Sequence, residues 1–95
     1  MLLGKIVGTV VSTQKDEKLA GLKFHVVKNV DADGKFTGGF VVAVDAVGAG
    51  TGEVVLVASG SAARQMDITQ AKPVDAVIMA IVDVIEIDGT ERYVK

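Results

Sequence analysis

The feature that most constrains the fold is a hydrophobic period of two, which recurs along most of the chain. In residues 5–13, Ile6 and Val10 fall on one face of an extended segment, and Val7 and Val11 fall on the other. Alternation of this kind with β-branched side chains is typical of strands, because such side chains pack well on a pleated surface. Residues 5–13 are therefore predicted to form a strand, and long helices are not expected.

The same criteria predict five more strands, over residues 22–30, 40–47, 53–59, 74–87 and 90–95. The stretch Asp-Ala-Asp-Gly at 31–34 predicts a hairpin, and the turn at 88–89 predicts that the last two strands pair. The only helical pattern covers residues 61–66, with Ser61 as the expected N-cap. Together these elements predict an all-β fold, an OB-like barrel of five to six strands with one short helix after the fourth strand.

Size and hydropathy together predict that the chain associates with a partner. Its 95 residues suit a single domain over residues 1–95. The mean hydropathy of +0.44 is high for a small domain, which buries a smaller share of its surface than a large one does. Residues 77–82 are apolar on both faces of their predicted strand, so either a neighbouring subunit or the short helix must cover the outer face.

Charge and composition exclude several classes of partner. With 10 basic and 12 acidic side chains, the chain lacks the positive field that collects nucleic-acid phosphates. The longest apolar run, residues 76–82, is far shorter than the roughly 18 residues of a membrane-spanning helix, and the N-terminus alternates unlike a signal peptide. We expect neither a nucleic-acid nor a membrane partner. Cysteine is absent, which excludes disulfides and is compatible with a cytoplasmic protein.

A glycine-rich loop, Gly48-Ala49-Gly50-Thr51-Gly52, follows the third predicted strand and resembles the start of a dinucleotide-binding loop. Its glycine spacing is one residue short of that motif. Glu53 and a β-branched strand follow, where a phosphate-binding loop needs the N-terminus of a helix. The sequence favours a packing role for these glycines. A small oligomeric module that binds an anion or nucleotide through the loop is the alternative.

No arrangement of residues in the sequence predicts an enzyme, a metal site or a cofactor. His25 is the only histidine, and it has no neighbouring nucleophile with which to form a catalytic pair, so a solvated or packing role is favoured. Arg64 has two open interpretations. It forms a fork with Asp45 or Glu53 that fixes the loop, or it is an exposed side chain that contributes little.

Three stretches resemble the EutN/CcmL family of bacterial microcompartment vertex proteins: GKIVGTVVSTQK, DAVGAGTGEVVLVASGSAARQ and PVDAVIMAIVD. The resemblance implies an OB-like homopentamer that caps the five-fold vertices of a carboxysome or metabolosome shell in the cytoplasm. It also implies that hexameric shell proteins are its partners and that it catalyses no reaction. The segments 31–39 and 86–95 fall where members of the family vary.

The resemblance further implies a structural motif close to the subunit contacts. Its first part is the signature loop, and its second part caps the fourth strand. Its third part belongs to the last core strand and the residues before it. The motif residues are Gly48, Ala49, Gly50, Gly52, Glu53, Gly60, Ser61, Arg64, Asp75 and Asp83.

Overall fold

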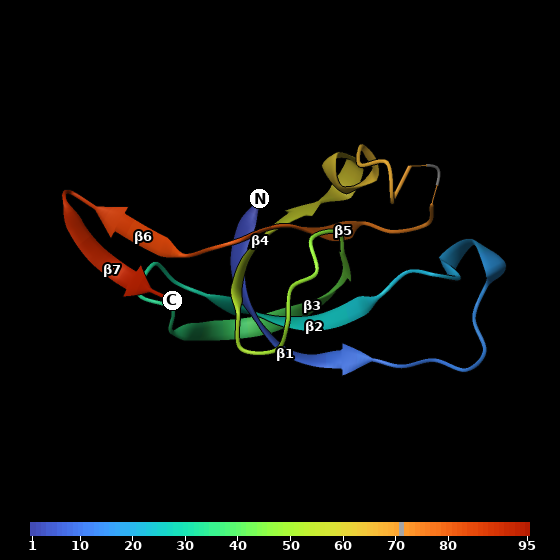
Figure 1. Ribbon diagram of the computed structural model, residues 1–95, viewed down its shortest axis with the longest axis horizontal. Helices are drawn as coiled ribbons and strands as arrows, with labels where there is room; N and C mark the ends of the chain where they lie inside the picture. Colours follow the sequence, from blue (N-terminus) through green and yellow to red (C-terminus); the bar gives the residue numbers. More distant parts are fainter. Residues whose placement is uncertain (71) are drawn as a thin grey trace.

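Five strands close into a barrel in the computed structural model, which describes residues 1–70 and 72–95 (Figure 1). Around the barrel the strands follow the order β1-β2-β3-β5-β4. All neighbours are antiparallel except β3 and β5, which are parallel and close the barrel. The strands are β1 (Leu2–Val10), β2 (Phe24–Val30), β3 (Phe36–Asp45), β4 (Val54–Ser59) and β5 (Ala76–Ile81). The predicted all-β barrel is confirmed, with five strands.

The period of two in the sequence corresponds to the alternation between barrel interior and exterior. The inward residues form a core in which every barrel strand takes part, and they are fully buried: Ile6, Val27, Ala43, Val55, Val57 and Ile78. Each buried aliphatic side chain of this kind contributes about 1.5–3 kcal/mol through the hydrophobic effect.

The predicted short helix is a 3-10 segment, η2 (Gly60–Arg64), which follows β4. Ser59, rather than Ser61, occupies the N-cap position, and its side chain makes no capping hydrogen bond, so the predicted Ser61 cap is wrong. The segment lies outside the barrel, where Ala63 packs in a second cluster with Val44 and Val77. The short helix therefore covers the start of the outer face of β5, while Met79, which packs beside this second cluster, remains only half-buried.

The predicted strand over residues 74–87 is wrong in its length, because the chain forms two strands there. β5 ends at Ile81, and β6 (Val84–Ile87) begins a separate two-stranded sheet with β7 (Thr90–Val94). The break has a clear cause. The Val82 N–H donates to the carbonyl of Val54, the first residue of β4, so beyond this point β5 has no partner strand.

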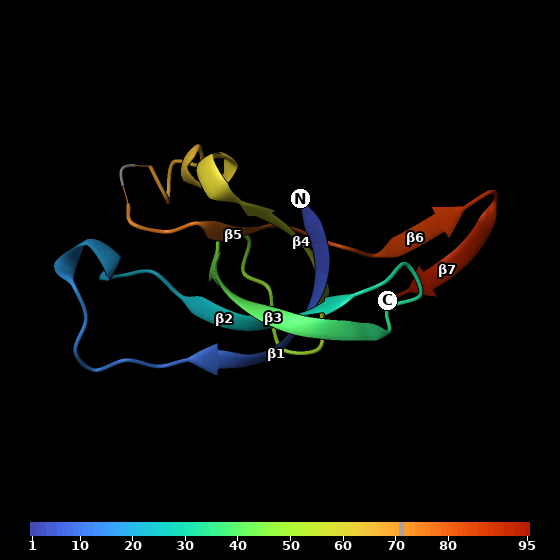
Figure 2. The same ribbon diagram turned by 180° about the vertical axis from the view of Figure 1, so that it is seen from behind.

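The pairing of the last two strands through a turn at Asp88 and Gly89 is confirmed, and both turn residues have positive φ. The resulting β6–β7 hairpin projects from one end of the barrel in both views (Figures 1 and 2). At the other end, a long connection between β1 and β2 carries a second 3-10 segment, η1 (Glu17–Leu19).

Candidate functional site

The glycine-rich loop is held at its start by Asp45, the last residue of β3. One carboxylate oxygen, Oδ1, accepts hydrogen bonds from the N–H groups of Val47, Gly48 and Ala49 at 2.9, 2.8 and 3.2 Å. The other oxygen, Oδ2, lies 3.0 Å from Nε2 of His25 in β2. A single buried carboxylate thus joins two strands and the first half of the loop.

Glu53 holds the other end of the loop. Its Oε1 accepts a hydrogen bond from the Gly50 N–H at 2.6 Å, and its Oε2 accepts one from Nζ of Lys95 at 2.7 Å. The backbone adds two bonds to β1: Gly52 N–H donates to the Ile6 carbonyl at 2.8 Å, and Ile6 N–H donates to the Glu53 carbonyl at 3.0 Å. The loop is therefore tied to β1 and to the C-terminal residue.

These contacts argue against anion binding by the loop. A phosphate-binding loop presents backbone N–H groups to its ligand. Here the N–H groups of Val47, Gly48, Ala49 and Gly50 all donate to the chain's own carboxylates. Two fixed negative charges replace the anion, so the geometry does not favour the anion-binding alternative.

Two of the loop glycines are required by the backbone conformation. Gly48 has φ +75° and Gly52 has φ +92°, in the left-handed region that residues with a Cβ rarely adopt. Gly50 differs, since its φ is not positive and an added Cβ would lie 3.6 Å from the nearest atom, Oε1 of Glu53. Backbone conformation therefore explains the need for glycine at positions 48 and 52, but not at position 50.

The carboxylates that clamp the loop have lowered pKa values. Burial raises the pKa of Asp45, but the hydrogen bonds from Val47, His25, Ala49 and Gly48 outweigh this effect and bring the pKa below its ordinary value. The hydrogen bond from Lys95 is the main cause of the lowered pKa of Glu53, and the same bond raises the pKa of Lys95. Both carboxylates therefore stay charged near neutral pH.

His25 is a buried packing residue, not a solvated one, with only 2% of its surface exposed. Because Asp45 is ionised, Nε2 of His25 must be the donor in their hydrogen bond. Within the described part of the chain, Nδ1 has no hydrogen-bond partner. The histidine orients the Asp45 carboxylate, and within residues 1–70 and 72–95 that carboxylate is the one hydrogen-bond partner of its side chain.

The second part of the motif lies beyond the far end of β4. Gly60 N–H donates to the Asp75 carbonyl at 2.8 Å, and Nη1 of Arg64 donates to the Val74 carbonyl at 3.3 Å. Ser61 is exposed on the same segment. These bonds attach η2 to the residues that lead into β5.

The structure does not form the predicted fork between Arg64 and the loop carboxylates. Arg64 bonds to the backbone carbonyl of Val74, whereas Asp45 binds His25 and the loop amides, and Glu53 binds Gly50 and Lys95. Asp83 lies near the Glu53 end of the loop, because its carbonyl accepts a hydrogen bond at 2.8 Å from the N–H of Lys95, the residue whose Nζ binds Glu53. The ten motif residues therefore fall into two groups on one chain, the loop residues with Asp83 near Glu53, and the η2 residues with Asp75.

Two contacts that position the loop are not predicted from the sequence. The first joins Asp45, predicted only as a partner of Arg64, to the loop amides, although an aspartate shortly before a glycine-rich turn commonly accepts such hydrogen bonds. Lys95 lies 42 residues from Glu53, and no local pattern indicates that pair.

Comparison with known proteins places the chain in a family. The family described as "Ethanolamine utilisation protein EutN/carboxysome" matches residues 1–83. The chain belongs to the EutN/CcmL family. The match covers the barrel and ends where the β6–β7 hairpin begins.

Relatives of this EutN/CcmL chain match it over nearly their full length. The carboxysome shell vertex protein CcmL of Thermosynechococcus vestitus is 44% identical over 95 residues, which are all of this chain and 96% of that protein. The solved structure of Gloeobacter violaceus CcmL is 42% identical, with a TM-score of 0.95 over 100% of this chain and 98% of that one. The GrpN pentameric microcompartment shell protein from Rhodospirillum rubrum is 46% identical, with a TM-score of 0.83 over 92% and 99%.

Two other kinds of site are absent from the described residues. No group of three or more His, Cys, Asp or Glu side chains there is placed to hold a metal ion. No helix in that part of the chain is long and apolar enough to cross a membrane. The relatives of this EutN/CcmL chain are named as structural shell proteins rather than enzymes.

Proposed function

We propose that five copies of this chain form a ring that closes the five-fold vertices of a bacterial microcompartment shell in the cytoplasm. The observation that carries the proposal is the match to shell vertex proteins over the whole chain, at 44% identity and with a TM-score of 0.95. At this similarity we expect the subunit surfaces of this chain, and not only its fold, to match those of the vertex proteins. The pentameric GrpN protein supplies the ring number.

The neighbours of the ring in the shell are hexameric shell proteins under this proposal. A closed shell tiled by hexamers needs twelve five-fold corners, and a ring of five identical subunits fits each of them by symmetry. The chain has no catalytic task in this function, and it needs no cofactor.

The motif residues act in this proposal as a rigid frame for subunit contacts. Gly48, Ala49, Gly50, Gly52 and Glu53 form a loop that is fixed before assembly, so that little conformational entropy is lost when a neighbour packs on it. The second group (Gly60, Ser61, Arg64 and Asp75) and Asp83 hold the two ends of β5 in place. These roles are supported by the hydrogen bonds that the residues make within the chain, as described above.

Shells assembled in bacteria with and without this chain test the proposed function. Together with hexameric shell proteins, the wild-type chain is expected to give closed shells, and its omission to give open or elongated ones in electron micrographs. Arg64→Ala is expected to lower the fraction of closed shells, whereas the control Lys35→Ala, outside the motif, leaves it unchanged. Equal closure with and without the chain would refute the function. Normal closure with Arg64→Ala would refute only its role in the motif.

A further inference from the structure

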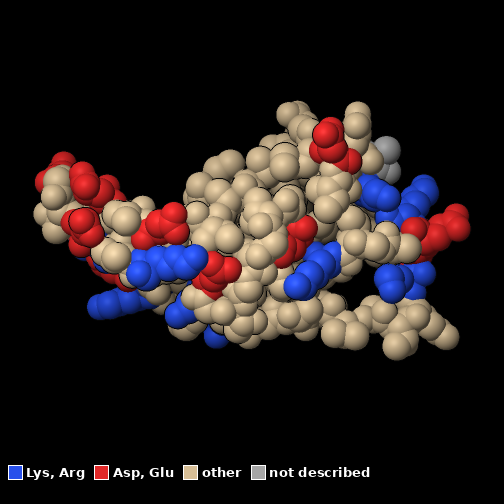
Figure 3. All heavy atoms as spheres, viewed as in Figure 1, with Lys and Arg blue, Asp and Glu red and all other residues tan. Residues whose placement is uncertain are grey.

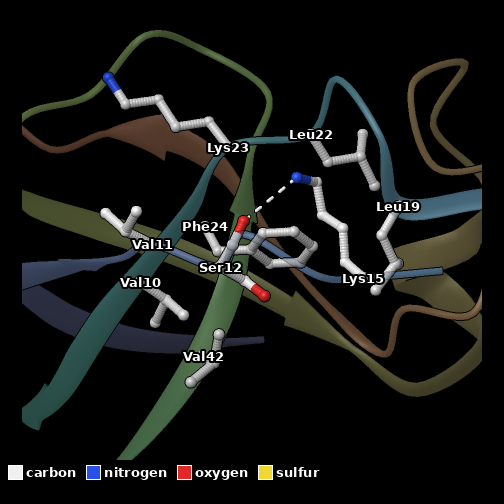
Figure 4. Close-up of a pocket in the computed structure, with 9 residues that line it drawn as sticks. All are labelled: Val10, Val11, Ser12, Lys15, Leu19, Leu22, Lys23, Phe24 and Val42. Atoms are coloured by element: carbon white, nitrogen blue, oxygen red, sulfur yellow. Dashed lines mark hydrogen bonds between the residues drawn. The ribbon is translucent and has the colours of Figure 1, made fainter. Parts of the chain in front are cut away.

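An apolar groove with a basic rim lies at the end of the molecule that carries η1 (Figure 4). We call it the basic groove. Its volume is about 450 Å³, and its apolar lining includes Val10, Val11, Leu19, Leu22, Phe24 and Val42. Among the residues that the structure describes, Lys15 and Lys23 are the only charged ones that line it, and no carboxylate does. In Figure 4 the Lys15 side chain lies beside Leu19 and Phe24, and Lys23 points outward from the rim.

The lining of the basic groove is exposed to a degree that is unusual for aliphatic side chains. Val11 is 86% exposed, and Val10 and Val42 are also exposed. Val10 and Val11 lie where β1 ends and the long connection to β2 leaves the barrel, whereas Val42 lies in β3, and within the described residues all three side chains stay open to solvent. An exposed apolar groove with a polar rim is typical of a protein–protein contact site.

The β6–β7 hairpin carries an opposite pattern of charge. Glu86 pairs directly with Glu91 across the two strands, and Asp88 lies in the turn between them. Like charges directly opposite each other destabilise a hairpin. None of these three carboxylates forms an ion pair with any residue of 1–70 and 72–95. The pair therefore has no compensating cation in its own chain.

The same hairpin exposes apolar side chains that lack a partner. Val84, Ile87 and Val94 are between 41% and 60% exposed. A two-stranded hairpin is marginally stable by itself in water, and this one contacts the barrel end through two ion pairs, Arg92 with Asp33 and Lys95 with Glu53. The hairpin therefore presents unpaired carboxylates beside exposed apolar side chains. This surface is complementary to an apolar groove with lysines on its rim.

These two surfaces lie at opposite ends of an elongated chain. The molecule measures 46 Å along its longest axis and 24 Å and 21 Å along the others. The hairpin forms one end and the connection with η1 the other (Figure 1), and acidic side chains gather over the hairpin tip in Figure 3. The hairpin tip cannot reach the groove of its own chain, so any contact between them joins two copies.

We propose that the β6–β7 hairpin of each subunit docks in the basic groove of the next subunit, with Glu86 and Glu91 facing Lys15 and Lys23. The inference rests on the proposed ring, and it names the surfaces that form its interface. A contact of this kind is heterologous: each subunit gives one hairpin and receives one, and the ring closes when every groove is filled. Complementary charge fixes the register and excludes other pairings, while the apolar side chains supply the buried area.

Carbodiimide coupling of the wild-type protein tests the contact directly. This reagent joins a carboxylate to an amine only where the two touch. Glu53 and Lys95, 2.7 Å apart in one chain, serve as the internal control for the reaction. We expect amide links between the peptide that holds Glu86 and Glu91 and a peptide that holds Lys15 or Lys23, confined to cross-linked multimers. The control link without the hairpin link would overturn the proposal, as would hairpin links only to other surfaces of this protein.

Charge exchange tests the same contact by rescue. Lys15→Glu/Lys23→Glu alone or Glu86→Lys/Glu91→Lys alone places like charges together at all five junctions, so each double variant is expected to weaken ring assembly by roughly tenfold or more. The quadruple variant restores opposite charges at every junction and is expected to recover the wild-type ring. A mixture of the two double variants cannot alternate around an odd ring, so it should give open or even-membered assemblies. Double variants that assemble like the wild type would contradict the docking.

The oligomeric state of the wild-type protein distinguishes failure of the proposed function from failure of the proposed docking contact. If it is not pentameric, the proposed function fails, and the docking fails with it. If it is pentameric and closes shells while neither the cross-links nor the charge exchange behave as expected, the docking alone is wrong.

Discussion

Asp45 is the residue on which the geometry of the glycine loop depends most. Its two oxygens accept four hydrogen bonds, three from the loop backbone and one from His25, in a site where the residue is only 7% exposed. A sequence pattern identifies the glycines, but it does not reveal that a preceding carboxylate occupies the amides that a phosphate would need. That information depends on the folded path of the chain.

Asp45→Asn is expected to destabilise the protein by about 1–3 kcal/mol. The amide retains one oxygen for the loop N–H groups but presents an NH₂ group to the donor nitrogen of His25. Urea unfolding at a fixed protein concentration measures the loss, because assembly makes apparent stability depend on concentration. The control is Asp33→Asn, which breaks the exposed pair with Arg92 and should cost at most about 1 kcal/mol. Equal losses for both variants would contradict the role of Asp45.

The lowered pKa of Asp45 predicts the pH dependence of this contribution. Its ordinary pKa is 3.8, and the folded value is lower because hydrogen bonds to the carboxylate outweigh burial. A lowered folded pKa gives stability that is full above the unfolded pKa and lost as the pH falls through the folded one. The difference in unfolding free energy between wild type and Asp45→Asn should therefore shrink as the pH falls below about 4. A difference that grows in acid would be inconsistent with this sign.

At the scale of elements, the alternating pattern identified the barrel strands, but it could not show where pairing stops. Residues 74–87 are mostly apolar and contain no glycine or proline, and Asp83 alone does not distinguish a break from a surface position within one strand. The break arises because β4 begins at Val54, which leaves Val82 as the last residue of this segment with a barrel partner. The length of the strand with which a segment pairs depends on the tertiary fold, and a local sequence pattern does not predict it. The same limit applies to the predicted Ser61 cap, which is wrong because the 3-10 segment begins at Gly60, with Ser59 in the N-cap position.

Two glycines of β1 give a matched test of how closely the barrel is packed. A Cβ at Gly4 would collide with Cγ1 of Val27 and lie 3.1 Å from the Lys28 carbonyl, whereas a Cβ at Gly8 would meet nothing within 4 Å. Gly4→Ala is therefore expected to destabilise the protein by about 1–3 kcal/mol. Gly8→Ala should be neutral or slightly stabilising. Thermal unfolding compares them, and equal melting temperatures would contradict the packing described for β1 and β2.

At the scale of the whole molecule, the sequence predicted association but not its geometry. The excess of apolar residues in a small domain indicates a partner, and the structure locates unpartnered apolar surface at both ends of the chain. Whether a head-to-tail contact closes after five subunits depends on the rotation between neighbours, which no sequence pattern encodes. The number of subunits in the proposed ring comes from a pentameric relative. The proposed contact between the hairpin and the groove supplies the interface between neighbouring subunits.

The mass of the wild-type assembly tests the central claim most directly. Native mass spectrometry at micromolar concentration is expected to show one dominant species of five chains, about 49 kDa from the 9.8 kDa of one chain. A single species is predicted because a closed ring leaves no groove or hairpin free for another subunit. A dominant monomer, or a ring with another number of subunits, would contradict the assignment of this chain to the five-fold vertices of a shell.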